Sequence, residues 1–131
     1  MSTAIQEVAT AFAPAALGAY SQAVKANGFV FVSGQLGIDP ETGELAGESA
    51  AEQATQALKN IKNILDAAGC GMDSIVRATI YLKDVEDFAA VNEEYAKVFL
   101  ASVKPARVAF GNNMIPKGAL VEIDAIAAVA E

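Results

Sequence analysis

Residues 49–69 read SAAEQATQALKNIKNILDAAG, and this stretch determines the predicted fold. Ser49 followed by Glu52 matches the capping box that begins a helix, and Gly69 supplies a C-terminal stop. Between these two signals, apolar residues recur at helical spacing in one stripe: Ala54, Leu58, Ile61, Leu65 and Ala68. The sequence therefore predicts a helix with one apolar face, which must pack against another element.

Two segments before this helix are predicted to form a hairpin. Tyr20–Ala26 and Phe29–Ser33 are strand-like and flank Asn27-Gly28. Asn-Gly between such segments is the strongest short hairpin signal, because both turn positions require a positive φ. A short strand near Ile5–Ala9 precedes them, so the N-terminal part is predicted to supply three strands.

Beyond the first helix, strands and a second helix are predicted to alternate. Ser74–Leu82 is rich in β-branched and apolar residues, as a buried strand is. Asp84 is expected to cap a helix whose apolar face comprises Phe88, Val91, Tyr95, Val98 and Phe99. Arg107–Asn112 and Ala119–Val129 are predicted to be the last two strands. Residues 1–131 would then form a single α+β domain, with both helices on one face of one mixed sheet.

The composition raises the question of where the apolar surface goes. Hydrophobic residues make up 53% of the chain without counting Gly, whereas about 45–50% is usual with Gly included. No apolar run approaches the roughly 18 residues of a membrane span. The surplus fits either an Ala-rich core or a subunit interface. The N-terminus lacks a secretion signal and the single Cys70 fits a reducing compartment, so we expect a cytoplasmic protein without membrane contact.

Charge and residue types exclude several classes of chemistry. The net charge is −7 and the nine basic residues are scattered, which makes nucleic acid an improbable partner. The chain contains no His, the commonest general base and metal ligand. One Cys cannot form a thiolate cluster. We therefore expect no metal site and no organic cofactor.

The predicted hairpin register brings two hydroxyl groups together. A two-residue turn at Asn27-Gly28 places Gln22 opposite Ser33, with Tyr20 one diagonal step away on the same face. These hydroxyls are candidates for binding a small molecule. Alternatively, Tyr20 only fills a sheet face and Ser33 is an incidental small polar residue.

Two charged residues in apolar strands are the strongest candidates for chemistry. Arg107 either forms a structural ion pair with Glu122 or another carboxylate, or binds a substrate carboxylate through two parallel hydrogen bonds. Strand alternation puts Glu122 on the same face as Asp124. A carboxylate among apolar neighbours acquires a raised proton affinity and can act as a general acid or base. Alternatively, Glu122 lies on a solvated edge strand.

One polar residue interrupts the apolar stripe of the second predicted helix. Asn92 lies four residues after Phe88 and three before Tyr95. A polar side chain in such a place must be hydrogen-bonded. Asn92 therefore either makes a structural bond that holds a loop or contacts the substrate.

These segments together resemble the Rid family, the reactive intermediate deaminases of the RidA/YjgF type. The resemblance covers nearly the whole chain in the correct order, and its combination of segments is specific although no single piece is. The matching segments are Ala13–Val24, Val32–Gln35, Asp39–Glu44, Gln53–Gly69, Val85–Tyr95, Lys104–Arg107 and Ile115–Ala127. The resemblance implies a fold like that of trimeric α/β chorismate mutase, a homotrimer with active-site clefts between subunits.

The resemblance also implies roles for five residues. In deaminating members an Arg binds the substrate carboxylate, and Arg107 matches it within Pro-Ala-Arg. A Glu positions or activates the attacking water, and Glu122 matches it. Tyr20 and Ser33 match residues that line the cleft, and Asn92 matches an Asn of the second helix. Arg107 and Glu122 would be catalytic, whereas Tyr20, Ser33, Asn92 and Arg107 would bind substrate.

The sequence departs from the family pattern near Arg107. Ala109 replaces a frequent Cys, and Phe110–Met114 replaces a segment that is generally apolar. Ala19 stands where Pro is common. Because Arg107 and Glu122 are both present, these differences bear on substrate choice rather than on activity.

The resemblance implies a cofactor-free enzyme that hydrolyses reactive 2-imino or enamine acids, such as 2-aminoacrylate, to 2-keto acids and ammonia. Two alternatives remain. One is an endoribonuclease or translation inhibitor of the L-PSP type, for which the sequence offers neither a cationic surface nor a clear general base. The other is a non-enzymatic metabolite-binding or chaperone-like module that uses Arg107 only to hold a small acid.

Overall fold

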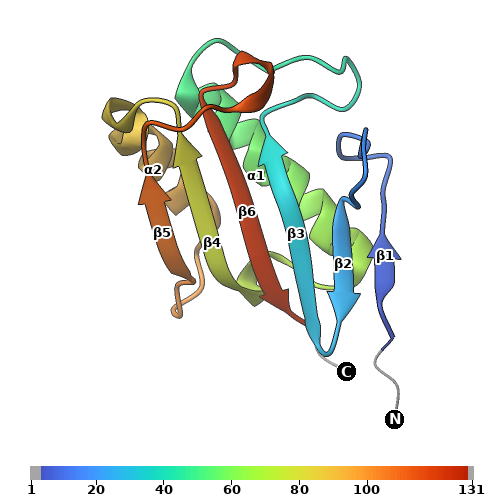
Figure 1. Cartoon of the computed structure of the whole chain (residues 1–131). Coiled ribbons are helices and arrows are strands. Elements are labelled where there is room, and N and C mark those ends of the chain that lie inside the picture. Colours follow the sequence, from blue (N-terminus) through green and yellow to red (C-terminus); the bar gives the residue numbers. More distant parts are fainter. Residues whose placement is uncertain (1–3, 130–131) are drawn as a thin grey trace.

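The computed structural model describes residues 4–129, which form one six-stranded sheet with two helices on one face (Figure 1). The predicted fold class and element order are confirmed. The helices are α1 (Ala50–Ala68) and α2 (Phe88–Val98). The strands are β1 (Gln6–Val8), β2 (Ala23–Ala26), β3 (Phe29–Leu36), β4 (Ile75–Leu82), β5 (Ala106–Phe110) and β6 (Val121–Ala128). Five strands are thus one to three residues shorter than predicted, whereas β3 extends three residues beyond its predicted end at Ser33.

The sheet places the last strand of the chain at its centre. The strand order is β1-β2-β3-β6-β4-β5, so β6 lies between β3 and β4 (Figure 1). All neighbouring strands are antiparallel except β4 and β5, which are parallel. The interpretation of Glu122 as a residue of an edge strand is therefore wrong, because β6 is hydrogen-bonded on both sides.

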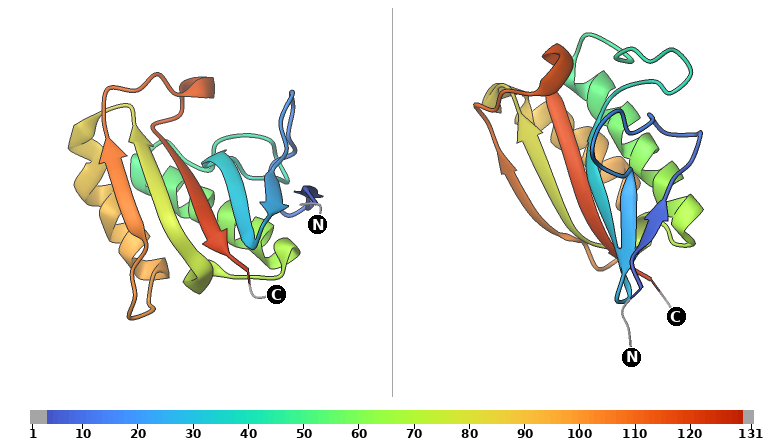
Figure 2. Two further views of the ribbon diagram at one scale, coloured as in Figure 1. Left: turned by 60° about the horizontal axis from the view of Figure 1, so that its bottom comes forward. Right: turned by 45° about the vertical axis from the view of Figure 1, so that its right-hand side comes forward.

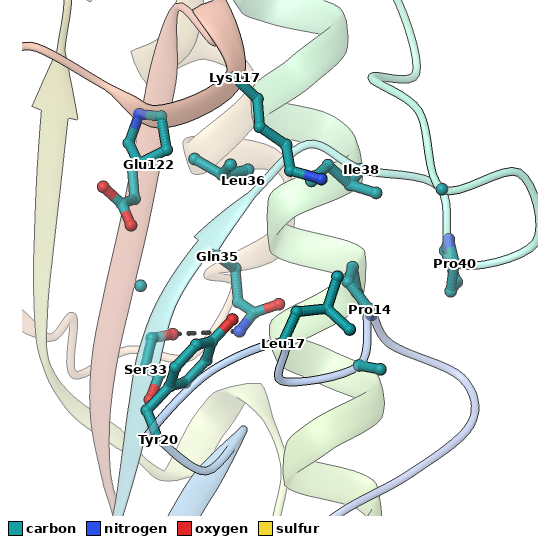
Figure 3. A pocket seen from close by; sticks show the side chains of 14 residues that line it. Pro14, Leu17, Tyr20, Ser33, Gln35, Leu36, Ile38, Pro40, Lys117 and Glu122 are labelled. Carbon is teal, nitrogen blue, oxygen red and sulfur yellow. Dashed lines mark hydrogen bonds between the residues drawn. The ribbon is translucent and has the colours of Figure 1, made fainter.

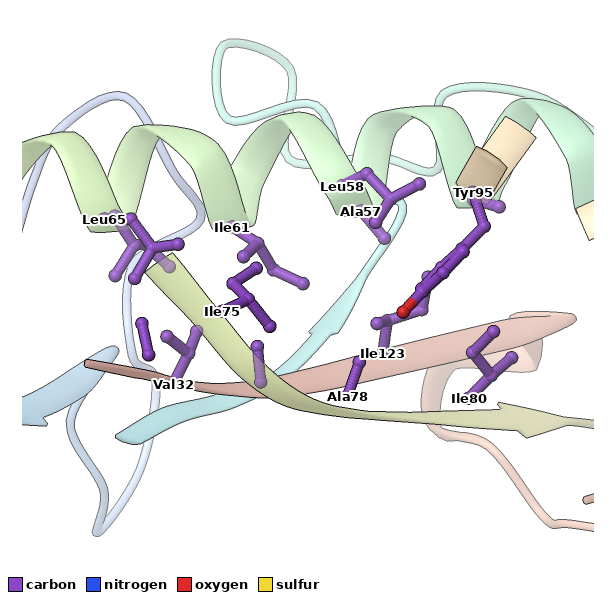
Figure 4. Packing of buried hydrophobic residues seen from close by; sticks show 14 of the residues in the cluster. Val32, Ala57, Leu58, Ile61, Leu65, Ile75, Ala78, Ile80, Tyr95 and Ile123 are labelled. Carbon is purple, nitrogen blue, oxygen red and sulfur yellow. The ribbon is translucent and has the colours of Figure 1, made fainter. Parts of the chain in front are cut away.

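The first helix forms as its sequence predicts. The Ser49 side chain accepts a hydrogen bond from the Glu52 backbone, the reciprocal bond is also present, and Gly69 ends the helix at a φ of 86°. Leu58, Ile61 and Leu65 point from α1 onto the strands (Figure 4). Burial of this stripe joins helix and sheet into one hydrophobic core.

The second helix begins later than its predicted cap. Asp84 accepts a hydrogen bond from the Glu86 backbone, but this bond caps a single 3₁₀ turn at Val85–Asp87, and α2 begins at Phe88. Val91 and Tyr95 form its fully packed face. The Asp84 cap therefore positions the entry to α2 rather than α2 itself.

The predicted hairpin register is confirmed, although its first strand is shorter. Ala26 pairs with Phe29, and the Ser33 backbone N–H donates to the Gln22 carbonyl at 3.0 Å. Regular pairing starts only at Ala23, because the Gln22 side chain is occupied by the preceding loop, where it bonds the backbone of Thr10, Ala13 and Pro14. Tyr20 therefore lies in that loop and not in the strand.

The face of the sheet opposite the helices has no covering element within residues 4–129 (Figure 2). Large apolar side chains stand on it, among them Phe31 and Phe110, which are 45% and 44% exposed. Within the same residues, no helix is long and apolar enough to span a bilayer. Buried alanines make up a large part of the core, so an Ala-rich core takes up part of the apolar surplus. A subunit interface on the uncovered face, and the trimer itself, stay predictions.

Candidate active site

A cavity of about 600 Å³ lies where β3 and β6 meet the N-terminal loop (Figure 3). Three of the predicted site residues line it: Tyr20 from the loop, Ser33 from β3 and Glu122 from β6. The predicted convergence of the Tyr20 and Ser33 side chains on one site is thus confirmed. Their roles in binding stay predictions.

A β-bulge in β3 shapes the wall of this cavity. Val32 pairs with Ala125 and Gln35 with Ile123, so Ser33 and Gly34 together oppose the single residue Asp124. The bulge reverses the alternation of β3 and places Leu36 beside Glu122 on the helix-free face. Without it, every residue of β3 beyond Ser33 would point to the other side of the sheet.

The bulge also makes room for the Glu122 side chain. A Cβ atom at Gly34 would lie 2.9 Å from the carboxyl carbon of Glu122 and 3.1 Å from its Cγ, closer than carbon atoms normally approach. The carboxylate therefore lies directly over the backbone of Gly34. Any side chain at this position would displace it.

The surroundings of Glu122 favour its protonated form. Burial raises the pKa of the Glu122 carboxyl, and the neighbouring Asp124 charge raises this pKa further. In residues 4–129 no protein donor is hydrogen-bonded to this carboxylate. Glu122 can therefore exchange a proton with a molecule bound in the cavity.

The Ser33 hydroxyl is partly committed to the fold. Its Oγ donates to the Ser21 carbonyl at 2.6 Å, which ties β3 to the loop that precedes β2. A hydroxyl that donates one bond can still accept others. Ser33 therefore both holds the loop and presents an acceptor to the cavity, whereas Tyr20 is 54% exposed at its mouth.

Arg107 lies on the other side of the sheet. Arg107 of β5 pairs with Ala78 of β4, which pairs in turn with Ala125 of β6. Both alanines are buried under the helices, so Arg107 points to the helix-covered face. The Arg107 guanidinium donates to Asn92 Oδ1 at 2.6 Å and lies over the Tyr95 ring at 4.8 Å. It lines a second cavity of about 490 Å³, with Asn92 and Lys104.

The contacts of Arg107 decide between its two interpretations within one chain. No carboxylate of residues 4–129 is within ion-pair distance of it, so the structural pair with Glu122 is excluded there. Asn92 occupies one of its donors, and a guanidinium has five. Asn92 thus orients Arg107, with donors left to bind a carboxylate.

The candidate residues therefore fall into two groups on opposite faces of one chain. Tyr20, Ser33 and Glu122 line the first cavity, whereas Asn92 and Arg107 line the second. A single chain does not bring the candidate carboxylate-binding group and the candidate base together. Both groups could act on one small molecule only if two chains supplied them.

Two polar residues of the first cavity were not singled out from the sequence. Lys117 and Gln35 both line it (Figure 3). Lys117 lies in the turn before β6, at a φ of 61°. Its position in sequence, five residues before Glu122, was the signal that could have placed it near the site. Gln35 follows the bulge, which the sequence did not reveal. Within residues 4–129, no cluster of three His, Cys, Asp or Glu side chains is arranged to hold a metal ion.

Comparisons with known proteins agree on one family. Residues 10–129 match the family described as Endoribonuclease L-PSP. A rat protein named 2-iminobutanoate/2-iminopropanoate deaminase is 48% identical over 128 residues, which cover 97% of this chain and 93% of that protein. A RutC family protein of Pyrococcus horikoshii is 50% identical over 115 residues, covering 88% of this chain and 90% of that protein.

Solved structures give the same result. RidA from the Antarctic bacterium Psychrobacter superposes with a TM-score of 0.89 at 45% identity, covering 95% of this chain and 99% of that one. TdcF of E. coli, solved with bound serine, superposes with a TM-score of 0.90 at 35% identity, covering 95% and 99%. The chain therefore belongs to the Rid family, which is also described as the endoribonuclease L-PSP family.

Proposed function

We propose that the protein hydrolyses 2-imino and enamine acids to 2-keto acids and ammonia. The observation that carries this proposal is the half-buried Glu122 carboxylate, which lines the first cavity, accepts no hydrogen bond from residues 4–129 and has a pKa raised by burial. A base of this kind suits removal of a proton from water near neutral pH. The name of the rat relative, a 2-iminobutanoate/2-iminopropanoate deaminase, supports the substrate class.

We propose further that the active site lies between the subunits of a homotrimer. Arg107 of one subunit would face Tyr20, Ser33 and Glu122 of the next. The separation of these groups on opposite faces of one chain supports this arrangement, as does the exposed apolar face of the sheet. Closed cyclic symmetry would generate three equivalent sites.

In this site Arg107 would bind the substrate carboxylate through its remaining donors, and Glu122 would act on water. Oxygen from water adds to C2 of the protonated imine, while one water proton passes to Glu122 and the π electrons of the C=N bond pass to nitrogen. Glu122 then returns this proton to the amine nitrogen. The C–N bond breaks as the hydroxyl oxygen forms the carbonyl, and the hydroxyl proton leaves with nitrogen as ammonium.

Nothing in this sequence of steps requires a metal or an organic cofactor, because the imine is already electrophilic and the enzyme supplies only orientation and proton transfer. An enamine enters the same path after protonation at carbon. The serine bound to E. coli TdcF supports a small amino-acid-like ligand. The single Cys supports the cytoplasm as the place of this reaction.

Generation of 2-aminoacrylate in situ, with ammonia and pyruvate measured as products, tests the activity. We expect the protein to accelerate product release above the spontaneous rate, and Arg107→Ala to abolish the acceleration. Equal rates with and without protein would remove the proposed function. Binding of the acid without turnover would instead favour the metabolite-binding alternative.

Mixed trimers test the intersubunit site. Arg107→Ala and Glu122→Gln chains, co-expressed with different tags, would each be inactive alone. A random mixture should regain about a quarter of the wild-type activity, because about one site in four would combine an intact Arg107 with an intact Glu122 from two chains. If both residues acted within one chain, the mixture would stay inactive. Light scattering that shows a monomer at micromolar concentration would also exclude the shared site.

A further inference from the structure

The Tyr81 side chain connects Asp124 to the face of the sheet that carries Glu122. The Tyr81 hydroxyl donates a hydrogen bond to Asp124 Oδ2 at 3.0 Å. Its ring packs edge-on against Phe110, with centroids 5.3 Å apart and planes at 81°. In the pairing of β4 with β6, Tyr81 is opposite Glu122. The phenol thus reaches diagonally past Glu122 and holds Asp124 in place.

Asp124 lies close to Glu122, beside the β-bulge that forms the wall of the first cavity. It lies two residues after Glu122 on the same face of β6, about 7 Å away along the strand. On the other side, the Ser33-Gly34 bulge is opposite Asp124, and Glu122 lies over Gly34. Two carboxylates therefore share one half-buried face, where two negative charges disfavour each other.

Within residues 4–129 of one chain, few other charges face Glu122. In the proposed trimer, Arg107 of the neighbouring subunit would be a further charge, of positive sign. Asp124 comes from its own strand and Tyr81 from β4, whereas Lys117 and Tyr20 line the cavity from the turn before β6 and from the N-terminal loop. The facing residues of β3, namely Ser33, Gly34, Gln35 and Leu36, do not titrate. Asp124 is the one negative charge in this set, and the Tyr81 hydrogen bond keeps it near Glu122.

We propose that Asp124, held by Tyr81, is a positioning residue that determines the pH range in which Glu122 exchanges a proton. This inference rests on the proposed function for its meaning in catalysis. The two carboxylates have different surroundings: Tyr81 donates to Asp124, whereas Glu122 has no protein donor within residues 4–129. The asymmetry leaves the Glu122 carboxylate, and not the hydrogen-bonded Asp124 carboxylate, free to exchange a proton with a molecule in the cavity.

A titration of the Glu122 carboxyl carbon by ¹³C NMR tests this inference without reference to turnover. Asp124→Asn should lower the pKa of Glu122 by about 0.5–1 unit, because it removes a like charge at nearly constant shape. Tyr81→Phe should lower it by less, because it only releases Asp124. Asp73→Asn is the matched control, since Asp73 is exposed near the opposite end of β4 and its substitution changes the net charge equally. It should leave the titration unchanged.

An unchanged titration in Asp124→Asn, or an equal shift in Asp73→Asn, would overturn the inference. If Asp124→Asn does not fold, Tyr81→Phe alone tests the inference. An unchanged pKa of Glu122 in Tyr81→Phe would then contradict it. In the deaminase assay, the acidic limb of kcat/KM should move to lower pH in Asp124→Asn by the same amount, since Glu122 must be ionised to act as a base. An inactive wild type would refute the proposed function, while the NMR titration would still decide this inference.

Discussion

At the scale of single residues, substitution of Arg107 shows whether the substrate carboxylate is bound by the planar guanidinium hydrogen bonds or by positive charge alone. Arg107→Lys keeps the charge but removes the planar fork and its contact with Asn92. A charge-assisted hydrogen bond contributes about 1.5–3 kcal/mol, which corresponds to roughly a 10- to 150-fold change. We therefore expect kcat/KM for imino-acid hydrolysis to fall at least about tenfold, measured by ammonia release at limiting substrate.

An uncharged substrate analogue is the control for this substitution. Without a carboxylate, wild type and Arg107→Lys should hydrolyse the analogue at similar rates, and circular dichroism and light scattering should show an unchanged fold and assembly. A Lys variant with full activity on the acid would show that Arg107 acts only as a positive charge. The proposed substrate class would then lose its main support.

Glu122→Gln separates proton transfer from binding. The amide preserves the shape of the side chain but cannot take a proton. Since general acid–base catalysis contributes about 10²- to 10⁴-fold, we expect kcat to fall at least about 100-fold, while pyruvate still binds in an NMR titration. Turnover at the wild-type rate would mean that Glu122 has a structural role and that another group activates the water.

At the scale of elements, buried amide side chains hold the loops around the first cavity. Gln53 of α1 donates to the Gly47 carbonyl at 3.0 Å and accepts from the Leu120 backbone N–H at 2.7 Å. Asn60 lies about two helical turns further along the same face, and it donates to the carbonyls of Leu36 and Ile38. Helix α1 thereby fixes both the exit of β3 and the entry of β6, between which the cavity lies.

Replacement of Gln53 by Leu should loosen this connection. The change leaves two backbone groups without their partner, and each unsatisfied buried group costs about 1–3 kcal/mol. We expect the free energy of unfolding to fall by about 2–4 kcal/mol, measured by urea denaturation at one fixed protein concentration. Gln6→Leu, at an exposed position of β1, is the matched control and should change it by less than about 0.5 kcal/mol. Equal effects would contradict this role of Gln53.

At the scale of the whole molecule, charge argues against cleavage of RNA. The net charge of −7 repels a polyanion, and without His the chain lacks the usual general base. We expect highly purified protein to leave a defined RNA intact, measured by gel analysis over the time in which deamination is complete. Cleavage that disappears in Arg107→Ala would contradict this expectation and favour the endoribonuclease alternative.

Local patterns were sufficient to predict the order of the elements and the candidate residues. The Ser49 capping box, the Asn27-Gly28 turn and the apolar stripes depend on neighbours in sequence, and the structure shows all three. The Asp84 cap was the exception, because a hydrogen bond over two residues caps a 3₁₀ turn as well as a longer helix. Strand ends were also less certain, because tertiary contacts such as those of Gln22 decide where regular pairing begins.

By itself, then, the sequence determined which segments are helices and strands, which family the chain resembles, and that Arg107, Glu122, Tyr20, Ser33 and Asn92 are the candidate residues. Only the tertiary structure decided that β6 enters the sheet between β3 and β4, that a bulge places Gly34 beneath Glu122, and that Arg107 and Glu122 lie on opposite faces. The physical reason is the separation in sequence over which each kind of interaction acts. Turn and helix signals act over a few residues, whereas strand order and register result from packing between segments far apart in the chain, for which no local pattern exists.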